Sequence, residues 1–217
     1  MPHIPGVHLL PSTGEFTYDT VAYLGARSSS GPLSAINSYY APGGSKTDYS
    51  YALDQLQAAH PECGTVSLVV SWFCDGVTAG ACNVYPSTTY INGTFQQAAG
   101  GADVWRCSGL TQNSSGLIPI PTDAGGSFIY GGTPSDPSIV RCIRDLKSRG
   151  LRIVFYPFLL LTSPGLPWRG RITFAPDLSS AATSAVDAFL GAASPSQFTG
   201  DTSNLTVSYS GSPTDWT

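Results

Sequence analysis

One stretch of the sequence, residues 131–161, constrains the fold of this chain more than any other. It predicts a capped amphipathic helix, with Asp136 as the N-cap, Pro137 at the first helical position and Gly150 directly after the last turn. Apolar residues recur on one face of this helix, at Ile139, Val140, Ile143 and Leu146. The nearly continuous apolar run over residues 153–161 is typical of a strand covered on both faces of a parallel sheet. The stretch is therefore half of a repeating α/β unit.

The same order of helix and strand occurs before and after this stretch. A helical stripe over residues 49–59 precedes a largely apolar, β-branched run over residues 66–73. A third helix is predicted over residues 178–190, and residues 205–209 are the candidate for a third strand. The order α-β-α-β-α-β predicts an α/β fold with parallel strands.

Two other segments lack this periodicity. Residues 1–47 are rich in turn formers, and we interpret them as an extended N-terminal arm before a domain over residues 48–217. Residues 76–127 form a long loop insertion, whereas ordinary connections in α/β units take about 2 to 6 residues. The insertion leaves the C-terminal end of a strand, where such folds place their sites. The surface of this insertion is therefore the best candidate to touch a glycan or a neighbouring subunit, and its aromatic residues are Tyr85, Tyr90, Phe95 and Trp105.

The composition argues against some classes of partner. Only 11% of the 217 residues are charged, against about 25% in an average soluble domain, and the formal net charge is −4. Nucleic-acid binding needs clustered Lys and Arg, so we expect no nucleic-acid partner. Neither a signal peptide nor a run of roughly 20 apolar residues is evident, so we expect no membrane span. The basic residues that do cluster are interpreted as a solvated helix face: Arg141, Arg144, Lys147 and Arg149.

The five cysteines show no metal-binding spacing. There is no Cys-x-x-Cys pair and no histidine is placed in the sequence so as to suggest a zinc site, so neither a metal nor a cofactor is expected. Cys74 and Cys82 lie at the two ends of a short loop and are the candidate pair for a disulfide. We interpret Cys142 as a small core residue.

Several short motifs occur in an order that resembles a known family. They are Thr-Gly-Glu-Phe at 13–16, Ser-Leu-Val-Val-Ser-Trp-Phe at 67–73 followed by Cys-Asp-Gly, Tyr-Gly-Gly-Thr-Pro-Ser-Asp at 130–136, Ile-Arg-Asp-Leu-Lys-Ser-Arg-Gly-Leu at 143–151, Tyr-Pro-Phe at 156–158 and Pro-Trp-Arg-Gly-Arg-Ile at 167–172. In this order they resemble the glycoside-hydrolase TIM-barrel-like domain of baseplate hub proteins in siphophage tails and gene transfer agents. The resemblance extends over nearly the whole chain.

The resemblance implies a partial (β/α) TIM-barrel-like domain. The family's domain continues beyond the equivalent of Trp216, whereas this sequence stops at Thr217. A closed eight-stranded barrel takes about 250 residues. An open parallel sheet of such apolar strands would leave its edges and faces exposed to solvent. We therefore expect a second chain to supply the remaining sheet, or the sequence to be a fragment or a reduced version of the domain.

The resemblance and the incomplete barrel together predict a structural component of a phage or phage-like tail tip or baseplate. Such a hub or fibre-attachment protein acts in host attachment or entry. Its expected partners are other tail subunits, including a chain that completes the barrel, and a host surface glycan. The expected location is the tail tip of the virion, assembled in the host cytoplasm. The alternatives are a glycoside hydrolase or cell-wall-degrading enzyme used during entry, and a carbohydrate-binding module.

Enzymatic and glycan-binding roles rest on few residues. Glycoside hydrolysis usually needs two carboxyl groups about 5 to 9.5 Å apart, and only Asp75, just beyond the strand at 66–73, is well placed to be one. Asp75-Gly76 is also an ordinary turn sequence, which is the alternative. Sugar rings stack on aromatic faces and their hydroxyls bind arginine, and packing inside the domain is the alternative for these side chains. The glycan-binding candidates are Trp72, Tyr130, Trp168, Arg169 and Arg171.

Overall fold

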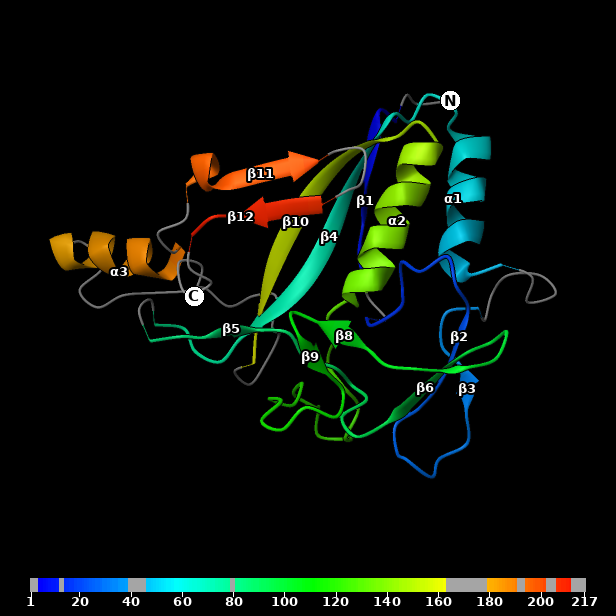
Figure 1. The fold of residues 1–217 in the computed structure, drawn as a ribbon, viewed down its shortest axis with the longest axis horizontal. Coiled ribbons are helices and arrows are strands. Elements are labelled where there is room, and N and C mark those ends of the chain that lie inside the picture. Colours follow the sequence, from blue (N-terminus) through cyan, green and yellow to red (C-terminus); the bar gives the residue numbers. More distant parts are fainter. Residues whose placement is uncertain are drawn as a thin grey trace. The chain divides into compact units, whose positions relative to one another are not determined.

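The computed structural model describes residues 4–11, 14–38, 46–78, 81–162, 179–190, 194–201 and 206–211 (Figure 1). The chain has a mixed α/β fold with a parallel sheet and three α-helices among these residues, which confirms the predicted class. It divides into two compact units. The first contains Met1–Trp72 and Pro86–Phe158, and the second contains Phe73–Tyr85 and Leu159–Thr217.

The parallel sheet has the strand order β1-β4-β10. Its strands are β1 (Gly6–Leu9), β4 (Thr65–Cys74) and β10 (Arg152–Leu161), and the short β5 (Val84–Tyr85) pairs antiparallel with the end of β4. Strands β1 and β4 run parallel, with Val7 beside Val66. The segment interpreted as an arm thus supplies one strand of the sheet, because β1 can hydrogen-bond along the free edge of β4.

Helices α1 and α2 begin and end at recognisable caps. Helix α1 (Asp48–Ala59) has Thr47 as its N-cap, whose hydroxyl oxygen accepts the Ser50 N–H at 3.3 Å. Helix α2 (Asp136–Ser148) is followed by Gly150 in the left-handed region with φ of 76°. The predicted N-cap of α2 is wrong by one residue. Ser135 is the N-cap, and the Asp136 carboxylate instead accepts the Ser108 N–H at 2.9 Å.

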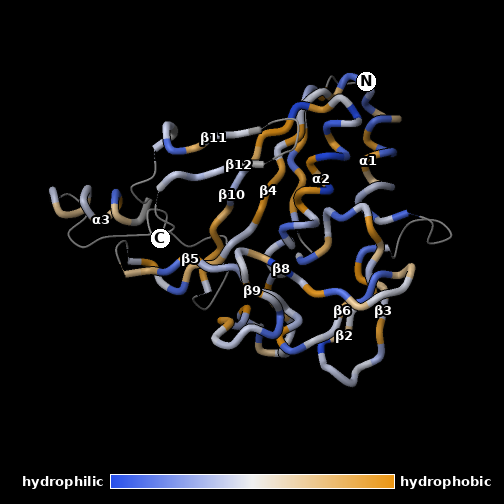
Figure 2. Tube along the Cα trace, viewed as in Figure 1, coloured by the Kyte–Doolittle hydropathy of each residue, from blue (hydrophilic) through white to orange (hydrophobic). Residues whose placement is uncertain are grey.

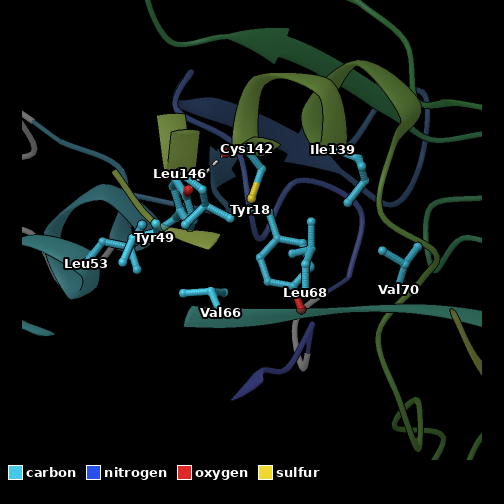
Figure 3. Close-up of a cluster of buried hydrophobic side chains, with 10 residues drawn as sticks. Tyr18, Tyr49, Leu53, Val66, Leu68, Val70, Ile139, Cys142 and Leu146 are labelled. Carbon is cyan, nitrogen blue, oxygen red and sulfur yellow. Dashed lines mark hydrogen bonds between the residues drawn. The ribbon is translucent and has the colours of Figure 1, made fainter. Parts of the chain in front are cut away.

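One hydrophobic cluster joins both helices to the sheet. Helices α1 and α2 run side by side along it (Figure 1), and their apolar faces meet the buried side chains of β4 (Figure 3). Tyr18 lies within the cluster, and its hydroxyl group contacts the Leu9 and Val69 carbonyl oxygens at 2.7 and 2.8 Å. Cys142 is a buried core residue, as predicted. The cluster consists of Tyr18, Tyr49, Leu53, Val66, Leu68, Val70, Ile139, Cys142, Leu146 and Leu151.

The long insertion folds as short antiparallel strands around a second cluster. Strand β6 (Thr94–Gln97) pairs with β2 (Tyr23–Ala26), and the sheet order is β3-β2-β6-β7. The remaining strands are β3 (Ser34–Ala35), β7 (Ala102–Asp103), β8 (Arg106–Cys107) and β9 (Leu110–Thr111). Phe95 and Trp105 are buried in this cluster with Phe16, Tyr23 and Cys107. These two aromatic residues of the insertion therefore stabilise the domain and are not contact residues on its surface.

The second unit contains helix α3 (Ser180–Leu190), a 3-10 turn (Pro195–Gln197) and a hairpin. The hairpin pairs β11 (Phe198–Asp201) antiparallel with β12 (Thr206–Tyr209). The strand predicted near residues 205–209 is thus present but belongs to a separate two-stranded sheet. A short connection allows antiparallel pairing, whereas parallel pairing needs a longer crossover.

Arg141 of α2 and Arg149, the C-cap residue of this helix, were expected to be solvated but are paired with carboxylates. Arg141 donates two hydrogen bonds to the buried Asp19, from Nε at 2.7 Å and from Nη2 at 2.6 Å. Arg149 binds Asp145 and Asp54, both at 2.8 Å. The first pair ties the segment before β2 to α2, and the second ties α2 to α1.

Substitution of Arg141 should destabilise the first unit strongly. Arg141→Met removes the ion-pair partner of the buried Asp19 side chain, and breaking such a pair costs about 3–5 kcal/mol. Arg106→Met is the matched control, because Arg106 is exposed in its pair with Asp103 and such pairs contribute about 0–1 kcal/mol. Urea unfolding of both variants measures the difference. Equal losses of unfolding free energy would contradict this role of Asp19 and Arg141.

Candidate functional site

Strand β10 exposes apolar side chains in its middle, whereas the apolar side chains of its neighbour β4 are mostly buried. Val154, Phe155 and Tyr156 are 44%, 51% and 46% exposed, whereas Val66, Leu68 and Val70 of β4 are buried. Apolar residues nevertheless recur along both strands (Figure 2). Single exposed apolar residues are ordinary, but three consecutive ones on a strand form a contiguous surface. We call Val154, Phe155 and Tyr156 the β10 patch.

The β10 patch extends over both faces of the parallel sheet. Ile153 packs partly against the cluster that joins α1 and α2 to the sheet. Because side chains alternate along a strand, Phe155 lies on the same face as Ile153, and Val154 and Tyr156 lie on the opposite face. The prediction that this run is covered on both faces is therefore wrong for its middle. The reason is position: among the described strands, β10 is the last in the order β1-β4-β10.

Asp75, the candidate catalytic carboxylate, holds a loop. It is exposed directly after β4, and its two oxygens accept the Asn83 backbone N–H at 2.7 Å and the Asn83 side-chain amide at 2.8 Å. These hydrogen bonds lower the pKa of Asp75 below its ordinary value. A general acid for glycoside cleavage needs a raised pKa instead. The contacts match the alternative interpretation of Asp75-Gly76 as a turn.

The structure describes only two of the five glycan-binding candidates, Trp72 and Tyr130. Trp72 is half-buried and packs against both hydrophobic clusters of the first unit. Tyr130 is also half-buried, and burial raises the pKa of its hydroxyl group. Trp168, Arg169 and Arg171 lie outside the described residues. Packing therefore accounts for Trp72 where the structure describes it.

Cys74 and Cys82 are both free thiols, so the candidate disulfide is not formed in this structure. Cys74 is buried at the end of β4, and burial, with Cys82 and Asp75 nearby, raises its pKa to about 12. The thiol therefore stays protonated and unreactive at neutral pH.

A buried carboxylate that was not among the predicted site residues joins three segments of the first unit. Glu15 is 2% exposed, and its Oε1 accepts hydrogen bonds from Thr88 Oγ1 at 2.7 Å, Thr89 N–H at 2.6 Å and Thr89 Oγ1 at 3.1 Å. Its backbone carbonyl oxygen accepts the Ser135 N–H at 2.8 Å. Glu15 thus connects the N-terminal segment, the insertion and the start of α2.

Two glycines allow this close packing. Gly14 has a φ of 83°, and a Cβ at this position would collide with the backbone of Gly132. A Cβ on Gly132 would in turn collide with Glu15 Oε1. The motifs Thr-Gly-Glu-Phe and Tyr-Gly-Gly-Thr-Pro-Ser-Asp contain these residues, so their glycines were the sequence signal for a close approach of the two segments.

No protein-family model and no curated protein matches this chain. No described helix is long and apolar enough to cross a membrane. Within the described ranges, no three or more His, Cys, Asp and Glu side chains are grouped so that they could hold a metal ion. The exposure of Val154, Phe155 and Tyr156 makes the β10 patch the candidate functional site.

Replacing Glu15 by Gln should remove a pH dependence of stability. Burial raises the pKa of Glu15 above its ordinary value of 4.5, so the folded chain holds this proton more tightly than the unfolded chain. The resulting stability is fully present below pH 4.5 and is lost as pH rises through the folded-state pKa. In urea unfolding, the stability of the wild type relative to Glu15→Gln should therefore fall from acidic to neutral pH.

Glu62→Gln is the control with the opposite sign. Hydrogen bonds from the backbone N–H groups of Glu62 and Ile4 lower the pKa of Glu62, so its contribution is present above its ordinary pKa and is lost as pH falls. Identical pH profiles for the wild type and Glu15→Gln would contradict the role assigned to Glu15.

Proposed function

We propose that this chain is a structural component of a phage or phage-like tail tip, in which it packs against neighbouring subunits through the β10 patch. The observation that carries the proposal is the exposure of Val154, Phe155 and Tyr156 in the middle of an apolar strand. The ordered motifs that resemble those of baseplate hub proteins are the reason for proposing a tail tip as the assembly. In such an assembly the chain would act at the virion tail tip, in host attachment or entry.

Energetics favour a protein partner for the β10 patch. Burying a fully exposed Val or Phe side chain contributes about 1.5–3 kcal/mol, so covering these half-exposed residues contributes about 1 kcal/mol each. An edge strand also presents unpaired backbone groups that a second polypeptide can hydrogen-bond.

Phe155→Lys should keep the fold and prevent assembly, because it places a charge inside the proposed contact. The variant and the wild type are each expressed in a host that produces particles lacking this chain, and purified particles are labelled with gold-coupled antibody. We expect label at the tail tip for the wild type and none for Phe155→Lys. Leu33→Lys, at an aliphatic residue that is 41% exposed before β3, is the control that should assemble. Unlabelled tails with the wild-type chain, or normal incorporation of Phe155→Lys, would count against the proposal.

The glycoside-hydrolase alternative has its own test. The purified assembly and an Asp75→Asn assembly are incubated with cell-wall glycans, and released reducing ends are measured. We expect no turnover from either, because the Asp75 carboxylate is hydrogen-bonded within its loop. Turnover by the wild type that Asp75→Asn abolishes would show an enzyme and overturn this expectation.

A further inference from the structure

Strand β10 directs alternate backbone groups away from β4. The Arg152 N–H donates to the Gly64 carbonyl oxygen at 2.8 Å, and the Thr162 N–H donates to the Cys74 carbonyl oxygen at 3.0 Å. Even-numbered residues of β10 therefore hydrogen-bond toward the β4 side. Because successive residues of a strand hydrogen-bond toward opposite edges, Ile153 and Phe155 direct their N–H and C=O groups outward. No described strand pairs with β10 on that outer edge.

The side chains around this edge are self-complementary. Residues 152–156 read Arg-Ile-Val-Phe-Tyr, with Val154 in the centre. If two such strands pair antiparallel about a two-fold axis at Val154, each Ile153 lies opposite Phe155 and each Arg152 lies opposite Tyr156. Aliphatic–aromatic pairs and cations over tyrosine rings are favourable cross-strand neighbours. The two Val154 side chains meet at the axis.

Pro157 selects this register over the next one. About an axis at Val154, Ile153 and Phe155 of the two strands exchange both of their hydrogen bonds, and no other residue is required. An axis one residue further along, at Phe155, would place Ile153 opposite Pro157. Proline has no N–H group, so the Ile153 carbonyl oxygen would then be left unpaired.

We infer that the outer edge of β10 pairs antiparallel with β10 of a second copy of this chain, about a two-fold axis at Val154. The contact is isologous, so both copies use the same residues, and the pairing joins the two parallel sheets into one. The half-exposed Val154, Phe155 and Tyr156 become covered by their counterparts. This inference rests on the proposed function, because it names the partner of the same β10 patch.

Disulfide trapping of the full-length chain tests both the partner and the register. Val154→Cys places two thiols opposite each other in a non-hydrogen-bonded antiparallel pair, where Cα atoms are about 4.5 Å apart and a disulfide can close. Tyr156→Cys is the matched control, because it is equally exposed on the same face but lies opposite Arg152. The wild type measures the background from its five free cysteines. We expect cross-linked dimer from Val154→Cys to form at least about tenfold faster than from Tyr156→Cys.

Sedimentation velocity of the wild type over a concentration series is the second measurement. A mass of two chains is expected, and a mass of one chain at every concentration would overturn the inference. Equal cross-linking rates for Val154→Cys and Tyr156→Cys would also overturn it. A single-chain mass combined with failed incorporation of Phe155→Lys would assign the β10 patch to a different subunit, so the pairing of copies would fail while the proposed function stands.

Discussion

Strand β10 hydrogen-bonds to β4 along one edge and has no described strand along the other, although its sequence is as apolar as that of β4. Helices α1 and α2 cover one face of β4, so its apolar side chains form the core of the first unit. The middle of β10 has the composition of a core strand but the exposure of a surface strand. Parallel sheets are normally covered on both faces, so this edge is the place where we propose that another polypeptide binds.

Buried polar contacts fix the segments of the first unit, which contains most of β10, in one arrangement. Asp19 and Arg141 bind the segment before β2 to α2, and Glu15 binds the N-terminal segment to the insertion and to the start of α2. Both carboxylates are buried and hydrogen-bonded, so these contacts fix the segments in one arrangement. A strand edge held on such a unit loses little freedom when it binds a partner.

The sequence predicted those elements whose signals are local. The apolar stripe and Gly150 indicated α2, and the apolar runs indicated β4 and β10. The four residues of β1 show no periodicity, and their place in the sheet depends on pairing with β4. The burial of Glu15 depends on Thr88 and Thr89, and that of Arg141 depends on Asp19, all far away in the sequence. The exposure of β10 could not be predicted either, because it depends on which other segments lie beside the strand. An apolar run has the same sequence pattern whether or not another strand covers it.

We propose that a second polypeptide covers the outer edge of β10. An experimental structure of the chain in its assembled form, at a resolution that traces the backbone, tests it most directly. We expect a strand from another chain to be hydrogen-bonded to the outward N–H and C=O groups of Ile153 and Phe155. An outer edge that faces solvent in the assembly, or that residues of the same chain close, would contradict it.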